Sequence, residues 1–136
     1  MQTADQTGMT HLKSPYNAAE TLDRLKILVF SKGLDIFATI DHRAAAEAVG
    51  LAMTPATVLI FGSPKAGTPL MIAAPTLALD LPLKALIWQE PSGATWLSYN
   101  TPEYFAERHG LPHEMMAAIG GIRTLCEAAV KPGPLL

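Results

Sequence analysis

Charge is scarce in this 136-residue chain, where Asp, Glu, Lys and Arg make up 16% of the residues, against about 25% in average proteins. The ten basic residues are scattered and the net charge is −2, so the basic face of a nucleic-acid-binding protein is not expected. Low charge beside an apolar share of 49% indicates that a partner covers part of the surface. Self-association as a homodimer is the simplest such arrangement.

Cysteine and long apolar runs are scarce as well. Cys126 is the single cysteine, which excludes an internal disulfide and a thiolate metal cluster within the chain. It stands among Ile122, Leu125 and Ala129, so we expect a buried, unreactive thiol. No apolar run approaches the ~20 residues of a membrane helix, and the first ten residues lack a secretion-signal pattern. We therefore expect a soluble cytoplasmic protein without a membrane partner.

Apolar periodicity in the rest of the chain predicts interleaved helices and strands. A flexible tail over residues 1–13, with a possible edge strand at Met9–Lys13, precedes a single globular domain over residues 14–136. The expected helices cover about 17–32, 42–49, 69–79 with a kink at Pro75, 102–109 and 112–129, and the expected strands cover 34–40, 56–61, 83–89 and 95–99.

The last two expected strands are joined by the turn Pro91-Ser92-Gly93, which predicts a hairpin with Trp88 and Trp96 as cross-strand neighbours. Interleaved elements followed by a hairpin favour an α+β fold. We predict a two-layer sandwich in which a mixed sheet of about four to five strands packs against helices, with a C-terminal hairpin and helices.

The most distinctive motif is Gly62-Ser63-Pro64-Lys65-Ala66-Gly67-Thr68, which lies between a buried strand and the start of a helix. Backbone N–H groups at such a position can bind anions. The spacing of Gly62 and Gly67 matches the start of a P-loop, but Thr68-Pro69 replaces the Lys-Ser or Lys-Thr that must follow. Nucleotide hydrolysis is therefore not expected. Two interpretations stay open: a rigid turn with Thr68 as a helix cap, or a loop whose Lys65 meets a small polar or anionic ligand.

Asp41-His42 follows an expected strand and opens an expected helix. A carboxylate beside an imidazole suits acid/base catalysis. Adjacent residues rarely face each other on a helix, however, so the competing interpretation is a capping Asp41 followed by a packed or solvent-facing His42. Asp80 and Lys84 flank the turn before the third strand and are placed to reach the end of the sheet near Lys65.

The remaining histidines give no metal motif. His109 and His113 are four residues apart, but Gly110 and Pro112 break the helix that would present them on one face, so no metal site is expected. No Ser-His-Asp arrangement or nucleophile elbow is visible in the sequence.

Three blocks of sequence carry a family resemblance: Phe37-Ala38-Thr39-Ile40-Asp41-His42, Phe61-Gly62-Ser63-Pro64-Lys65-Ala66-Gly67-Thr68-Pro69-Leu70-Met71 and Asp80-Leu81-Pro82-Leu83-Lys84. Over about residues 14–112 the chain closely resembles the bacterial and archaeal family called domain of unknown function 302 (DUF302). The resemblance implies a compact α/β sandwich that is often a homodimer. It implies no established activity, catalytic residue or cofactor.

The leading hypothesis is a non-catalytic binding module, acting as a homodimer, for a small polar or anionic ligand. Its expected site, without metal or cofactor, is made by Asp41, His42, Gly62, Lys65, Gly67, Thr68, Asp80 and Lys84. The alternatives are an enzyme that uses Asp41 and His42 for acid/base chemistry, and a purely structural or interaction protein.

Overall fold

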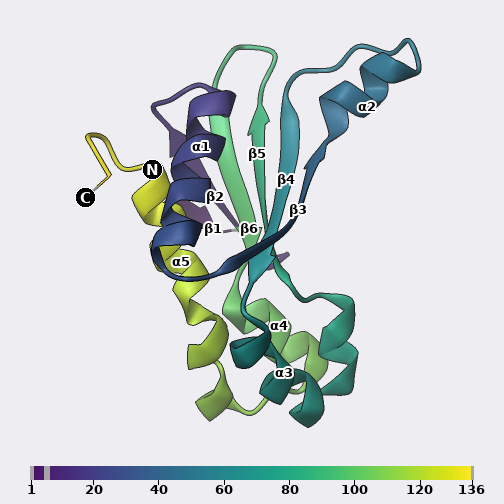
Figure 1. The fold of residues 1–136 in the computed structure, drawn as a ribbon, viewed down its shortest axis with the longest axis vertical. Coiled ribbons are helices and arrows are strands. Elements are labelled where there is room, and N and C mark those ends of the chain that lie inside the picture. The colour runs from purple at the N-terminus through teal and green to yellow at the C-terminus, as the bar shows by residue number, and fades with distance from the viewer. Residues whose placement is uncertain (1, 5–6, 136) are drawn as a thin grey trace.

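A single antiparallel sheet organises the computed structural model, which describes residues 2–4 and 7–135 (Figure 1). Its six strands stand in the order β1-β2-β6-β5-β4-β3. Their bounds are β1 Gln2–Ala4, β2 Met9–Ser14, β3 Asp35–Asp41, β4 Ala56–Gly62, β5 Leu83–Gln89 and β6 Thr95–Asn100.

Helices connect or follow these strands, so the α+β class predicted from the sequence is confirmed. The α-helices are α1 Ala18–Ser31, α2 His42–Ala48, α3 Pro64–Ala73, α4 Pro102–His109 and α5 Ala117–Ala129, with 3-10 turns η1 at Pro75–Leu79 and η2 at His113–Met115. The predicted kinked helix is divided at Pro75, because proline ends α3 and starts η1.

The strand directions correct one prediction. All neighbouring strands within the described residues run antiparallel, so the expectation of a mixed sheet is wrong. The reason lies in the connections: α2 and α3 lie beyond opposite ends of β4 instead of crossing a face of the sheet (Figure 1). A strand that re-enters the sheet from such an end connection runs antiparallel to the one before it.

The amino-terminal segment also differs from the prediction. Met9–Ser14 is a strand, but it pairs with β6 on one side and with β1 on the other, so it is not the edge strand that was expected. Gln2–Ala4 lies in the sheet and not in a tail. Residues 1, 5 and 6 of the predicted tail lie outside the described residues.

The core lies between one face of the sheet and the helix pair α1 and α5, which are in contact with each other. Apolar residues of α1 and α5 meet alternate residues of the strands, as the period-two exposure of β5 shows. The apolar side chains with at most 1% exposure among the described residues are Leu25, Val29, Leu59, Phe61, Leu70, Leu77, Ala85, Ile87, Leu97, Ile122, Cys126 and Ala129. The prediction that Cys126 is buried is confirmed, and this burial raises the pKa of its thiol.

The opposite face of the sheet carries the tryptophan pair. Trp88 of β5 stands across from Trp96 of β6, and their rings stack with centroids 6.3 Å apart, which confirms the predicted cross-strand neighbours. The Trp88 Nε1 group donates a hydrogen bond to the Ser98 hydroxyl at 2.9 Å. Both tryptophans keep intermediate exposure, so this face is less deeply covered than the face under α1 and α5.

A clamp around Arg24 holds the carboxyl end of α5 against α1. The Arg24 guanidinium donates hydrogen bonds to the backbone carbonyls of Ala129, Lys131 and Gly133, at 2.7 to 2.9 Å. It also lies 4.1 Å from the ring centroid of Tyr16. A planar guanidinium can satisfy several carbonyls while it stacks on an aromatic ring, which a lysine cannot do.

Candidate functional site

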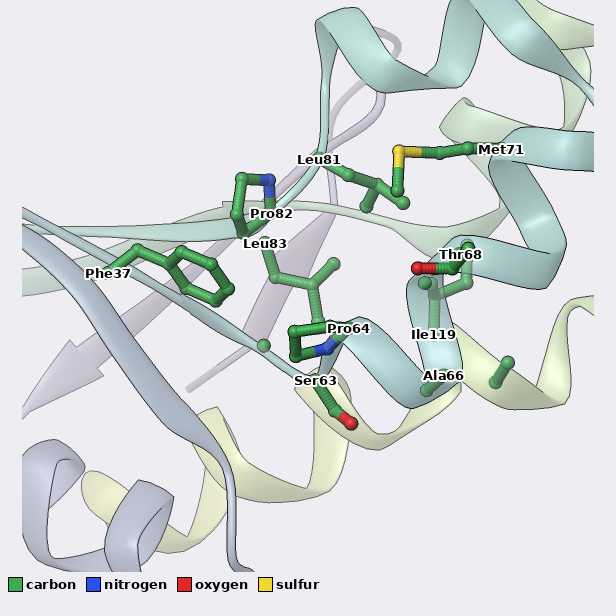
Figure 2. A pocket seen from close by; sticks show the side chains of 13 residues that line it. Phe37, Ser63, Pro64, Ala66, Thr68, Met71, Leu81, Pro82, Leu83 and Ile119 are labelled. Atoms are coloured by element: carbon green, nitrogen blue, oxygen red, sulfur yellow. The ribbon is translucent and has the colours of Figure 1, made fainter.

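The strand β4 leads directly into α3, and a pocket of about 160 Å³ lies beside this junction (Figure 2). The helix begins at Pro64, so the segment predicted as a loop through Gly67 is in fact the first turn of α3. Proline suits this first position because its missing N–H would have no partner there and its φ is already helical. We call this cavity the α3 pocket.

Three separate parts of the chain wall the α3 pocket. The helix α3 contributes Gly67, Thr68 and Met71, the turn before β5 contributes Leu81 and Pro82, and α5 contributes Ala118 and Ile119. The peptide bond between Leu81 and Pro82 is cis. Among all 13 lining residues, only Ser63 and Thr68 have polar side chains and none is charged.

A bulge in β3 supplies the remaining wall. The register between β3 and β4 shifts between Ile36 and Ala38, which leaves Phe37 at the irregularity. Bulges turn a side chain away from the regular alternation of a strand. Phe37 lies next to Pro82 at one side of the pocket, and half of its surface is exposed.

A second cavity of about 340 Å³ adjoins the first. We call it the α1–α5 groove, because it is lined by Lys32 and Leu34 just after α1 and by six residues of α5, namely Ala118, Ile119, Gly121, Ile122, Thr124 and Leu125. It shares six lining residues with the α3 pocket, among them Ser63, Ala66 and Ile119. The two cavities therefore lie next to each other around the first turn of α3.

Among the residues that the structure describes, Lys32 is the one charged residue that lines the α1–α5 groove. Within the described ranges, no carboxylate lies within ion-pair distance of its ammonium group. Ser63 is in an extended conformation at the N-cap of α3, yet its hydroxyl makes no capping hydrogen bond. Both polar groups are thus available to a ligand.

The predicted site residues divide into three groups in the structure. Gly62, Gly67 and Thr68 line the α3 pocket. Lys65 is an exposed residue of α3 that lines neither cavity. The sequence could not separate Lys65 from its neighbours, because its placement depends on where the helix begins.

Asp41 and His42 lie at the other end of β3, where α2 begins. The Asp41 carboxylate accepts a hydrogen bond from the backbone N–H of Ala44 at 2.9 Å, so it caps α2. His42 is exposed. Neither residue lines the α3 pocket or the α1–α5 groove, so the structure does not bring them together with Gly62 or Lys65.

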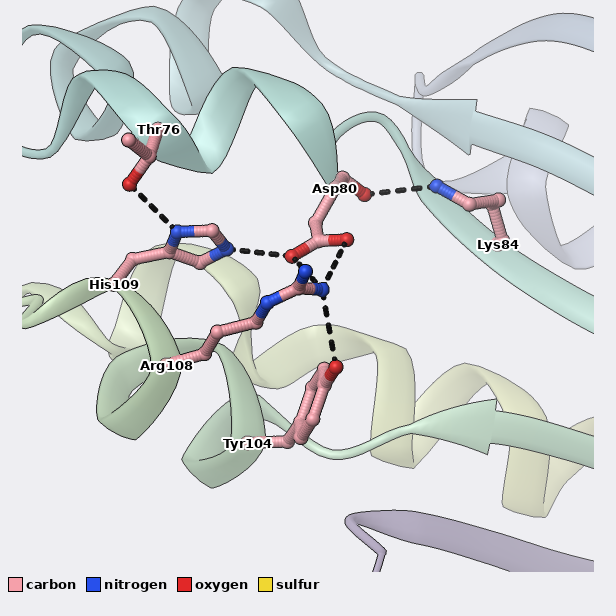
Figure 3. A network of polar contacts seen from close by, with 6 residues as sticks. All are labelled: Thr76, Asp80, Lys84, Tyr104, Arg108 and His109. Atoms are coloured by element: carbon pink, nitrogen blue, oxygen red, sulfur yellow. Dashed lines mark hydrogen bonds and ion pairs between the residues drawn. The ribbon is translucent and has the colours of Figure 1, made fainter.

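Asp80 belongs to a polar network on the far side of the Leu81–Pro82 turn (Figure 3). Its carboxylate contacts the Nε2 atom of His109 at 2.5 Å and accepts hydrogen bonds from Nη1 of Arg108 at 3.1 and 3.2 Å. Lys84 donates to the backbone carbonyl of Asp80 at 3.0 Å. Neither Asp80 nor Lys84 lines the α3 pocket or the α1–α5 groove, so the structure does not bring them together with Gly62, Gly67 and Thr68 around a cavity.

The network continues to Thr76 and Tyr104, which the sequence analysis did not select. The Thr76 hydroxyl lies 2.8 Å from Nδ1 of His109, and Arg108 also donates to the Tyr104 hydroxyl at 3.1 Å. The His109 side chain is only 4% exposed. The network therefore ties η1 to α4 and fixes the turn that carries Leu81 and Pro82. No sequence signal pairs residues about thirty positions apart, so only the structure could reveal this arrangement.

The imidazole of His109 uses both nitrogen atoms within this network, whereas His113 lies in η2. The helix between them ends at Gly110, which has a left-handed conformation. The sequence thus anticipated correctly that the two histidines do not share one helix face.

Comparison with known proteins finds a family model and curated relatives that match this chain. The family model described as "Domain of unknown function DUF302" matches residues 10–129. Proteins named "Fluoride-specific ion channel FluC 1" from Brucella suis and Brucella abortus are each 40% identical over 105 residues, which is 77% of this chain and 41% and 39% of those proteins. The chain therefore spans about two fifths of the length of these curated relatives.

A solved structure shares the fold. It is described as an uncharacterized conserved DUF302 protein from Bacillus stearothermophilus, and it covers 90% of this chain and 95% of its own with a TM-score of 0.75 at 17% identity. No helix in residues 2–4 and 7–135 has the length and hydrophobicity required to cross a bilayer. The match over most of the chain and the agreement in fold identify this protein as a member of the DUF302 family.

Proposed function

We propose that this chain is a non-catalytic binding module whose ligand lies in the α3 pocket. The observation that carries the proposal is a cavity of about 160 Å³ whose 13 lining residues include no charged side chain. Cavities of about 150 Å³ with apolar walls hold a molecule of the size of benzene. The lining therefore favours a ligand with a small apolar body, in place of the wholly polar or anionic ligand that the motif suggested.

The lining and the fixed walls of the α3 pocket support a role in ligand binding. Ligand sites are concave and mostly apolar, with a small number of polar groups that orient the bound molecule. Ser63 and Thr68 are the polar side chains in this lining. The pocket also lies between elements held by buried residues and by the Asp80 network, so its walls are preformed and binding requires little ordering.

The enzyme alternative receives less support. Asp41 already caps α2, and the pair Asp41 and His42 lies at the opposite end of β4 from the α3 pocket. Acid/base chemistry needs its side chains within hydrogen-bond reach of a bound substrate. A binding role for the α3 pocket needs no such group.

A titration with 4-phenyl-1-butanol, followed through the backbone amide signals in NMR spectra, tests the proposal. We expect the amides of residues 62–68, 81–83 and 118–119 to shift. Gly67→Leu should abolish these shifts, because the new side chain points toward Leu81 and Met71 across the pocket. Gly120→Leu is the matched control, because nothing lies within 4 Å of a Cβ at that helical glycine. Unchanged spectra of the wild type, or identical behaviour of the two variants, would exclude the α3 pocket as a binding site.

Self-association is a second proposal, with its own observation. Among the residues whose burial is described, seven of the ten exposed large apolar side chains lie between residues 27 and 53, on α1, on the edge strand β3 and just after α2. We infer that a second copy of the chain covers this surface. Direct pairing of β3 with its copy, centred on Ala38, would place Asp35 opposite Asp41, and like charges in that position repel each other. Side-chain contacts are therefore favoured over strand pairing.

Light scattering over a range of protein concentrations tests this second proposal. Val49→Glu should shift the dimer toward monomer, because it places a charge in the apolar surface. Ile72→Glu is the matched control: Val49 is 73% exposed and Ile72 is 76% exposed, but Ile72 lies outside the segment 27–53. A wild type that stays monomeric at millimolar concentration contradicts the proposal, as does equal loss of dimer in both variants.

We further propose that the module acts in the cytoplasm, where a chain with a single buried cysteine needs no oxidising compartment. Fractionation of cells that produce the tagged chain tests this. The fluoride-channel names of the Brucella relatives do not carry over to this chain, which spans about two fifths of their length.

A further inference from the structure

The α1–α5 groove indicates which charged group a ligand of the proposed binding site carries. It adjoins the α3 pocket through shared residues that include Ser63 and Ile119. The two cavities therefore lie side by side, and a ligand that extends from the pocket into the groove would contact these shared residues. The groove differs from the pocket in one respect that matters for recognition, which is that a cation lines it.

That cation is the ammonium group of Lys32, which follows the last turn of α1. Two other cationic side chains of the fold are paired with carboxylates: Arg108 with Asp80, and Arg123 with Glu103. Lys32 has no carboxylate partner within the part of the chain that the structure describes. An unpaired cation at the edge of an apolar cavity attracts a ligand group of opposite charge.

Ser63 supplies a second polar contact at the same place. It lines both cavities, and its hydroxyl does not cap α3. In most helices a serine at this position accepts a hydrogen bond from the first turn. Here the hydroxyl is able to donate to an anion that lies between the pocket and Lys32, and such charge-assisted hydrogen bonds are the stronger kind.

We infer that the ligand is a small amphiphile with a single carboxylate, whose apolar body fills the α3 pocket and whose carboxylate meets Lys32 and Ser63 in the α1–α5 groove. This inference rests on the proposed function. The single lining cation matches one negative charge, and no second lining cation is present among the described residues to balance a phosphate dianion. The carboxylate also explains why a lysine without a partner stands beside an otherwise apolar depression.

The test compares two probes that share one apolar body, 4-phenylbutyrate and 4-phenyl-1-butanol, by calorimetric or NMR titration at low salt. The wild type should bind the carboxylate about three- to fivefold more tightly than the alcohol, which is the range for a solvent-accessible ion pair. Added salt should reduce this preference, because it screens the charges.

Two matched lysine variants locate the effect. Lys32→Gln should remove the preference for the carboxylate, so that the two probes bind to this variant with similar affinity. Lys65→Gln should keep the preference, because Lys65 is exposed nearby but lines neither cavity.

The outcomes that contradict the carboxylate inference differ from those that contradict the proposed function. Equal binding of the two probes by the wild type, or equal effects of the two lysine variants, overturns the carboxylate inference while the binding module stands. If neither probe binds to the wild type, the proposed function fails together with the inference.

Discussion

The helices α2 and α3 lie beyond opposite ends of β4, because β3 leads into α2 and β4 leads into α3 (Figure 1). α2 buries none of its residues. α3 buries Leu70, contacts η1 and α5, and forms a wall of the α3 pocket. Both helices follow helix-start signals in the sequence, so the difference between their burial arises from packing. A cavity with fixed walls requires elements that hold one another in place, which only the α3 end provides.

Truncation of a leucine at each end should give the largest contrast. Leu77 of η1 is completely buried, and Leu77→Ala should reduce the free energy of unfolding by about 3 kcal/mol, because it removes buried methyl groups and leaves a cavity. Leu51, just after α2, is 65% exposed, and Leu51→Ala should cost less than about 0.5 kcal/mol. Urea unfolding at a protein concentration low enough to keep the chain monomeric measures both. Similar losses would mean that the α2 end is packed after all.

Removal of an aspartate at each end should give the next contrast. Asp80→Ala deprives the nearly buried His109 of its acceptor and should cost about 2 kcal/mol. Asp41→Ala removes only the cap of the exposed helix α2 and should cost about 1 kcal/mol or less. Thermal unfolding of the two variants tests the order, and a larger loss for Asp41→Ala would reverse it.

A glycine-to-alanine pair sharpens the comparison by separating stability from binding. Gly67→Ala in α3 and Gly120→Ala in α5 should each stabilise the protein by about 0.5 to 1 kcal/mol, because alanine is the better helix former. A Cβ at Gly67 would lie 3.7 Å from Leu81, which is ordinary contact, and nothing lies near Gly120. Only Gly67→Ala should weaken the binding of 4-phenyl-1-butanol. Destabilisation by Gly67→Ala would show that the pocket wall is tighter than this geometry indicates.

The smallest expected effect concerns the pair Glu103 and Arg123, which ties α4 to α5. The hydrogen bond from Arg123, at 2.7 Å, lowers the pKa of Glu103 below its usual range. A lowered carboxyl pKa contributes stability that is present above the usual value near 4.5 and is lost as the pH falls through the folded-state value. Because the pair is largely exposed, the contribution should be below about 1 kcal/mol.

Unfolding measured between pH 3 and pH 7 tests this contribution. Glu103→Gln should reduce the loss of unfolding free energy that occurs at acid pH in the wild type. The structure of α2, which lies beyond the other end of β4, should not change. An identical pH dependence of the two proteins would show that the ion pair adds nothing.

Local signals in the sequence were sufficient to predict most of the helices and strands. The helix around Leu25 and Val29 and the alternation of β5 were predictable because each reflects the burial of one face. Strand direction was not predictable, since it depends on whether α2 and α3 cross a face of the sheet or stay beyond its ends. That choice is made by contacts between distant residues.

The candidate site was predictable only in part, for a related reason. The glycines at positions 62 and 67 indicated the junction of β4 and α3 correctly, because turns and close packing restrict these positions. The motif indicated Lys65 as the cation of the site, whereas Lys32, which follows α1, lines the α1–α5 groove. The contact of His109 with Asp80 could not be predicted either, because no local sequence pattern links the two residues.

The clamp of Arg24 on the carbonyls of Ala129, Lys131 and Gly133 has a practical consequence for anyone who attaches something to this domain. It directs the carboxyl end of the chain toward α1, and Figure 1 shows that end far from α3. A fluorescent protein or surface tether joined after residue 135 would leave the α3 pocket unobstructed. Immobilised sensors for small carboxylates could be built on the domain from that end.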